Sequence, residues 1–128
     1  MATTSRFGLA TAANQDNTGR VATYETQTPV FAATLNIVPT QFDTTVKPGL
    51  LTGAITINVG VGSATLPPYV GDQLTFLFTA DATGRTVTLG TGMNVTAATI
   101  VIPASKKASI FFTFDGAAWV EGGRAITI

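Results

Sequence analysis

The chain has 128 residues, which is enough for one ordinary domain and too few for two of typical size. Only 11% of the residues are charged, and the seven basic and seven acidic side chains cancel, so no field attracts nucleic acid or an anionic membrane. The chain has no cysteine and no histidine, which excludes disulfides, thiolate zinc sites and histidine-based catalytic triads.

The first expected element is an extended N-terminal arm, residues 1–28. This segment is rich in Thr, Ala, Asn and Gln, and its few sizeable apolar side chains are too sparse to form a core. It shows neither a helical period nor a basic region followed by an apolar stretch, so we expect no export signal. We expect the arm to become ordered on a neighbouring polypeptide.

Residues 29–128 are expected to form a single all-β domain. Short runs alternate apolar and polar side chains with a period of two, so that one face of each run is apolar. Turn residues separate the runs every eight to twelve positions, as in a sandwich or a barrel. The predicted strands lie within 54–61, 73–79, 85–89, 99–102 and 108–114.

Proline and glycine mark the turns between these runs. Pro67 and Pro68 cannot donate to a strand ladder. Asp115-Gly116 is a favoured two-residue turn, and the strand that returns from it carries Trp119. The sequence therefore predicts an antiparallel β-sandwich or barrel, jelly-roll-like, and leaves the choice between sandwich and barrel open.

The carboxylates are the remaining candidates for catalysis. Several of them lie beside glycines in predicted turns, where a short carboxylate bonds nearby backbone, so a structural role is favoured. No alternating acidic residues suggest a calcium site, and we expect no metal, no cofactor and no enzymatic activity. The carboxylates considered are Asp43, Asp72, Asp81, Asp115 and Glu121.

Two apolar side chains lie out of phase with the core face of their strands. Leu77 is out of phase with Phe76 and Phe78, and Phe111 is out of phase with its neighbours in the same way. A large aromatic side chain on an outer face marks an interface more often than a solvent-facing patch. A surface with so little charge is also buried at low desolvation cost, so Leu77 and Phe111 are predicted to form a subunit interface.

The segment from Leu66 to Glu121 resembles small virion proteins of tailed phages: capsid decoration proteins, head fibres and tail-fibre modules. The features that carry the resemblance are the Pro-Pro turn with Gly71-Asp72, the strands at 73–78 and 86–90, and the Phe-Asp-Gly-x-x-Trp sequence that ends at Trp119. The resemblance implies a homotrimer on the capsid surface of a virion. It implies docking to the major capsid protein, or another virion protein, through the arm, with Arg6, Phe7 and Leu9 as anchors.

A tail-fibre or adhesin module that binds a receptor or a cell-surface glycan is the alternative. Exposed loops at 66–72, with Tyr69, and at 90–94 would then carry recognition. The aromatic side chains Trp119, Phe111, Phe112 and Phe114 could also form a stacking platform for a sugar, although the phase of Phe112 and Phe114 places them in the core and subunit contact is favoured. A polysaccharide-degrading enzyme is a third class, and only the dispersed carboxylates support it.

Overall fold

The structure is a computed structural model that describes residues 23–62 and 68–127. This part of the chain contains ten β-strands and no helix, which confirms the expected all-β class. The strands are β1 (Tyr24–Gln27), β2 (Thr34–Ile37), β3 (Asp43–Val46), β4 (Ile55–Val59), β5 (Gln73–Thr79), β6 (Arg85–Leu89), β7 (Met93–Asn94), β8 (Thr99–Ile102), β9 (Lys107–Phe114) and β10 (Trp119–Ile126).

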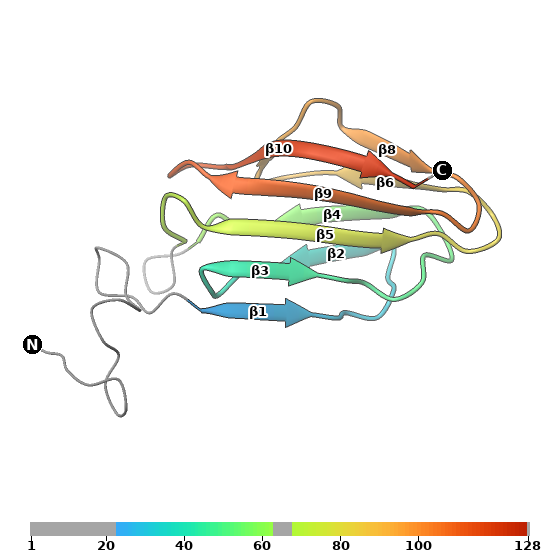
Figure 1. Ribbon diagram of the computed structural model, residues 1–128, viewed down its shortest axis with the longest axis horizontal. Helices are drawn as coiled ribbons and strands as arrows, with labels where there is room; N and C mark the ends of the chain where they lie inside the picture. The colour runs from blue at the N-terminus through green and yellow to red at the C-terminus, as the bar shows by residue number, and fades with distance from the viewer. Residues whose placement is uncertain (1–22, 63–67, 128) are drawn as a thin grey trace, which may run out of the picture.

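The strands form two sheets that face each other (Figure 1). The six-stranded sheet has the order β1-β3-β5-β9-β10-β7, and the four-stranded sheet has the order β2-β4-β6-β8. The period-two pattern turns one face of each strand inward, as expected of a sandwich. The largest fully buried side chains between the sheets are Trp119, Phe76, Phe78, Phe112, Leu51, Ile55 and Ile57.

The strand directions differ from the antiparallel arrangement that was expected. The chain alternates between the two sheets from β1 to β9, and up to β6 the successive strands of each sheet run in the same direction. The pairs β1–β3, β3–β5, β2–β4, β4–β6 and β7–β10 are parallel, and only β5–β9, β6–β8 and β9–β10 are antiparallel. The alternation of side chains fixes which face is buried but not the partner of a strand, so the sequence could not reveal these crossovers.

The β9–β10 hairpin is present, but its turn is longer than expected. Phe114 pairs with Trp119, so residues 115–118 form a four-residue connection instead of a two-residue turn. The Asp115 N–H donates to the carbonyl of Ala118 at 3.0 Å, and Gly116 adopts a φ of 105°, which favours glycine. The returning strand places the Trp119 ring in the core.

The segment expected to be an arm, residues 1–28, includes a strand of the six-stranded sheet. Residues 1–22 lie outside the described part, and with them the expected anchors Arg6, Phe7 and Leu9. Strand β1 pairs in register with β3, and the Glu25 carboxylate accepts hydrogen bonds from the Thr40 N–H at 2.7 Å and the Thr44 hydroxyl at 2.9 Å. Residues 24–27 are therefore the edge strand of the six-stranded sheet.

Candidate docking face

The outer face of the six-stranded sheet brings together the two side chains predicted to lie at an interface. Leu77 on β5 is 38% exposed and Phe111 on β9 is 50% exposed, while their strand neighbours point into the core. In the β5–β9 register Leu77 faces Ser109, and Thr75 faces Phe111. Leu77 and Phe111 are thus diagonal neighbours on adjacent strands, close enough to belong to one contact surface.

The Phe111 ring is supported by two glycines of β10. A Cβ atom added at Gly122 would lie 2.3 Å from Phe111 Cε2, and one added at Gly123 would lie 3.3 Å from Cε1. The register of β9 and β10 shifts between Glu121 and Gly123, so an extra residue in β10 creates this flat support. The ring packs on the backbone of Gly122 with half of its surface still exposed. Two adjacent glycines inside a strand were the sequence signal for this support, and sequence reasoning missed it.

Small side chains leave two hollows beside Phe111. Ser109 and Ala125 face each other across β9 and β10, and both residues line both hollows. The hollow on the Phe111 side has a volume of about 270 Å³, and the hollow toward Leu77 and Ile126 has a volume of about 310 Å³. The face therefore presents apolar side chains around space that a protruding side chain of a partner can fill.

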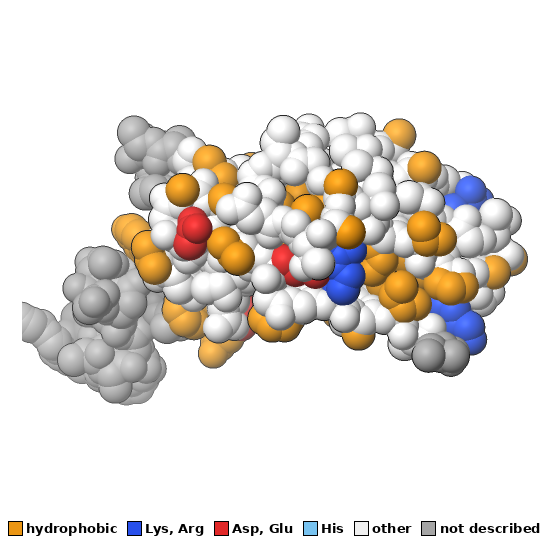
Figure 2. All heavy atoms as spheres, turned by 90° about the horizontal axis from the view of Figure 1, so that it is seen from above, with side chains coloured by type: hydrophobic (Ala, Val, Ile, Leu, Met, Phe, Trp, Pro, Cys, Tyr) orange, Lys and Arg blue, Asp and Glu red, His pale blue; other side chains and the backbone are white. Residues whose placement is uncertain are grey.

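Two lysines stand at the rim of the larger hollow. The Lys107 ammonium donates to the Thr79 hydroxyl at 3.4 Å, and Lys47 lines the same hollow. The ion pairs among the described residues are Arg85–Asp81 and Arg124–Glu121, so neither lysine has a described carboxylate partner. Figure 2 shows one face of the molecule with few charged side chains and with basic side chains at its right-hand end.

Four of the five carboxylates considered for catalysis are engaged in turns and ion pairs. Asp72 accepts from the Tyr69 N–H at 3.1 Å, and Asp81 accepts from the Thr83 N–H at 3.0 Å and from Arg85. Asp115 accepts from two N–H groups of its own turn, those of Ala118 and Ala117, which lower the pKa of its carboxyl. These bonds confirm the turn roles expected for Asp72, Asp81 and Asp115. Glu121 pairs with Arg124, and Asp43 begins β3.

Trp119, which was considered for a sugar platform, lies in the core instead. Its side chain is buried, its Nε1–H donates to the Gly60 carbonyl at 3.0 Å, and its ring packs 5.1 Å from the ring of Phe114. A buried indole that has found its hydrogen-bond partner stabilises the core and offers no surface for stacking. Of the four rings considered for a platform, Trp119, Phe112 and Phe114 are buried and only Phe111 is on the surface.

The described part of the chain contains no cluster of three acidic side chains that could hold a metal ion, and no helix long and apolar enough to cross a membrane. No protein-family model matches the chain, and no curated protein matches its sequence.

Proposed function

We propose that this chain is a structural subunit that works by packing against other polypeptides, as a trimeric decoration or head-fibre protein on a phage capsid. The observation that carries the proposal is the hollowed apolar surface around Phe111 and Leu77 on the six-stranded sheet. A large exposed aromatic ring usually marks a contact site, so we interpret the Phe111 ring on its two glycines as a surface that a partner covers.

The physical properties of this surface suit a protein interface. The Phe111 ring lies over the backbone of Gly122, so part of its surface is already covered before a partner binds. Rigid aromatic side chains next to a pocket are typical of the residues that dominate binding energy at interfaces. The face also lacks acidic side chains among the residues that line its hollows, so burial requires little desolvation of charge.

The virion setting is supported by the resemblance of residues 66–121 to small tailed-phage proteins. In that setting the arm, with Arg6, Phe7 and Leu9, docks on the major capsid protein, and the outer face of the six-stranded sheet contacts other copies of the chain. The loss of conformational entropy when such an arm becomes ordered is offset when many copies bind one lattice. The protein then acts by occupancy, without turnover of a substrate.

The first prediction separates the two contacts. The purified chain is expected to be an oligomer by light scattering at micromolar concentration, and Phe111→Ser is expected to reduce it to monomers because the supported ring is lost. Deletion of residues 2–22 keeps β1, so the truncated chain is expected to remain an oligomer. The truncated chain is also expected to be absent from phage particles in electron micrographs, because the arm that docks on the capsid is lost. A wild-type monomer, or a truncated chain that still decorates particles at full occupancy, contradicts the proposal.

Binding of a glycan by a tail-fibre or adhesin module is the second candidate. The half-exposed Phe111 ring favours it, since a flat aromatic surface beside a hollow also stacks on sugar rings. The lining of the hollows is mostly apolar, whereas a sugar needs several polar partners to fix its orientation. Glycan-array binding that is lost in Phe111→Ala while the oligomer persists would establish this function in place of the first.

A further inference from the structure

The charged side chains of the described residues are separated between the two ends of the sandwich. In the β3–β5–β9 register Asp43 faces Gln73, which faces Thr113, and at the opposite end Thr79 faces Lys107. Lys47 follows the last residue of β3 and Lys106 precedes β9, so both lie at the Lys107 end. The carboxylates of Asp43, Asp72 and Asp115 lie at the other end, where β3 and β5 begin and β9 finishes.

The two arginine–carboxylate ion pairs of the described residues leave this separation of charge unchanged. Arg85 pairs with Asp81 at 2.8 Å, and Arg124 pairs with Glu121 at 2.7 Å, so both arginines are neutralised locally. The described part of the domain therefore has one basic end and one acidic end, although the whole chain is neutral. A neutral molecule with opposite charges at its two ends attracts other copies of itself end to end.

The basic end contains the larger hollow of the docking face. Apolar groups of Leu77, Ala125 and Ile126 line it, and Lys47 and Lys107 stand at its rim. This arrangement accepts a side chain that is apolar at its tip and has a carboxylate next to it. The occupant is then held by burial of its apolar part and by attraction between the carboxylate and the lysines.

The acidic end offers such a side chain. Val70 is 74% exposed at the second position of a tight turn, in which the Asp72 N–H donates to the Tyr69 carbonyl at 3.0 Å. Gly71 follows with a φ of 95°, and its N–H donates to the Phe114 carbonyl at 2.9 Å, which fixes the turn on β9. Val70 is thus held out toward solvent in a defined position.

A carboxylate lies beside Val70 at this tip. A Cβ atom added at Gly116 would lie 3.3 Å from Val70 Cγ2, so the two turns are in contact, and Asp115 is the neighbour of Gly116. The Asp115 side chain is exposed and its pKa is held below the ordinary value, first by the N–H of Ala118 and then by that of Ala117. It is therefore negatively charged at neutral pH and available to the lysines of another molecule.

We infer that the Val70 tip of one copy inserts into the lysine-rimmed hollow of a second copy, so that the chain assembles tip to hollow. This inference deepens the proposed function and rests on its claim that copies of the chain assemble. A contact between two different surfaces of one chain repeats in a single direction and forms a ring when the rotation closes. The trimer of the proposed function is such a ring of three copies.

The test uses two full-length variants that each damage one side of the contact. Val70→Lys places a cation opposite the lysine rim, and Ala125→Glu fills the hollow with a negative charge opposite the acidic tip. Each variant alone is expected to be monomeric, with the dissociation constant raised by about tenfold or more, because an unpaired charge faces the partner surface. Val101→Glu is the matched control, since Val101 is 61% exposed on β8 in the other sheet.

Mixing the two variants gives the decisive result. The Ala125→Glu chain keeps an intact tip and the Val70→Lys chain keeps an intact hollow, so an equimolar mixture is expected to form species larger than either variant alone by light scattering. Circular dichroism of each variant checks that its β structure is retained. A mixture that stays monomeric, or single variants that keep the wild-type mass, overturns the inference.

Failure of this inference differs from failure of the proposed function. If Phe111→Ser dissociates the oligomer while Val70→Lys and Ala125→Glu leave it intact, the chain assembles through the docking face in another geometry, and only the tip-to-hollow contact is refuted. A wild-type chain that is monomeric at micromolar concentration refutes both.

Discussion

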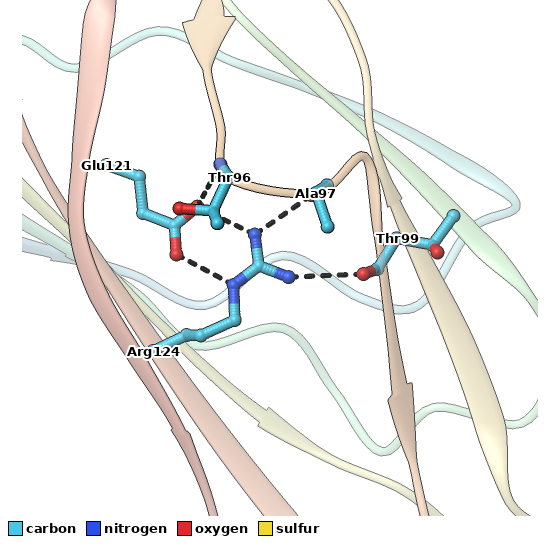
Figure 3. A network of polar contacts seen from close by, with 5 residues as sticks. All are labelled: Thr96, Ala97, Thr99, Glu121 and Arg124. Carbon is cyan, nitrogen blue, oxygen red and sulfur yellow. Dashed lines mark hydrogen bonds and ion pairs between the residues drawn. The ribbon is translucent and has the colours of Figure 1, made fainter.

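At the scale of single residues, the contacts of Arg124 join β10 to a different segment of the chain. Its guanidinium binds both carboxylate oxygens of Glu121 at 2.7 Å and donates to the carbonyls of Ala97 and Thr99 (Figure 3). Glu121 also accepts from the Thr96 N–H at 3.0 Å. The pair therefore ties β10 of one sheet to the chain that enters β8 of the other sheet.

This pair predicts a specific dependence of stability on pH. The Glu121 side chain is 4% exposed, and its hydrogen bonds with Arg124 hold the pKa of its carboxyl below the ordinary value of 4.5. A carboxyl whose pKa is lowered by folding stabilises the folded state above its unfolded pKa and loses that contribution as the pH falls through its folded pKa. Wild-type stability should therefore decline as the solution is acidified below 4.5.

The variant Glu121→Gln isolates this contribution. It is expected to lower the free energy of unfolding by about 1 to 2 kcal/mol at neutral pH, because Arg124 loses its anionic partner. Chemical denaturation at several pH values measures the effect, and the difference between variant and wild type should shrink as the pH falls. A difference that is unchanged between neutral and acidic pH would show that Glu121 is not the group that titrates.

At the scale of elements, the strands with strong alternation were predictable and their partners were not. The expected runs at 73–79 and 85–89 coincide with β5 and β6, because Leu74, Phe76 and Val87 alternate with polar side chains. Strand β1 was assigned to the arm because Tyr24–Gln27 has no apolar alternation, and its place depends on pairing with β3. Pairing of this kind depends on contacts between distant segments, which a local pattern does not contain.

The docking face was only partly predictable for the same reason. The phase of each strand turned Leu77 and Phe111 outward, so both residues could be identified from the sequence alone. The hollows could not be identified from the sequence, because they arise where Ser109 of β9 pairs with Ala125 of β10 next to an irregularity in register. The basic rim likewise depends on Lys47 and Lys107, which are far apart in the chain and line the same hollow.

The bulge in β10 gives a prediction at this scale. In Gly122→Ala the new methyl group would overlap the Phe111 ring, which lies on the surface and can swing away from β10. We expect the free energy of unfolding to fall by less than about 1 kcal/mol, since the ring is not part of the core. The oligomer should dissociate nevertheless, because the ring no longer has its fixed position.

Gly123→Ala provides the comparison for this experiment. Its Cβ atom would lie 3.3 Å from the ring, so a small adjustment accommodates it and assembly should be affected less than in Gly122→Ala. Denaturant unfolding and light scattering on both variants measure the two effects separately. Full assembly of Gly122→Ala would mean that the position of the Phe111 ring is irrelevant to the contact.

At the scale of the whole molecule, the arrangement of charge matters more than its amount. The chain is neutral, yet its three lysines lie at one end of the sandwich and the carboxylates of Asp43, Asp72 and Asp115 lie at the other. The parallel crossovers make this possible, since β3 and β5 run in the same direction and begin at the same end. The strand topology thereby places opposite charges at opposite ends of a neutral chain, and a head-to-tail assembly requires two ends that differ in this way.

This polarity predicts that assembly depends on ionic strength. The Debye length falls from about 10 Å at 0.1 M salt to about 3 Å at 1 M, so attraction between exposed charges of two copies is screened. Exposed ion pairs contribute up to about 1 kcal/mol each, so the dissociation constant should rise by about tenfold over this range and the apolar part of the contact should remain. Replacing Lys47 and Lys107 with glutamine should weaken assembly at low salt and remove most of this dependence, as measured by sedimentation. Assembly that strengthens with salt in the wild type would instead indicate a contact held by apolar burial alone, with the two charged ends playing no part in it.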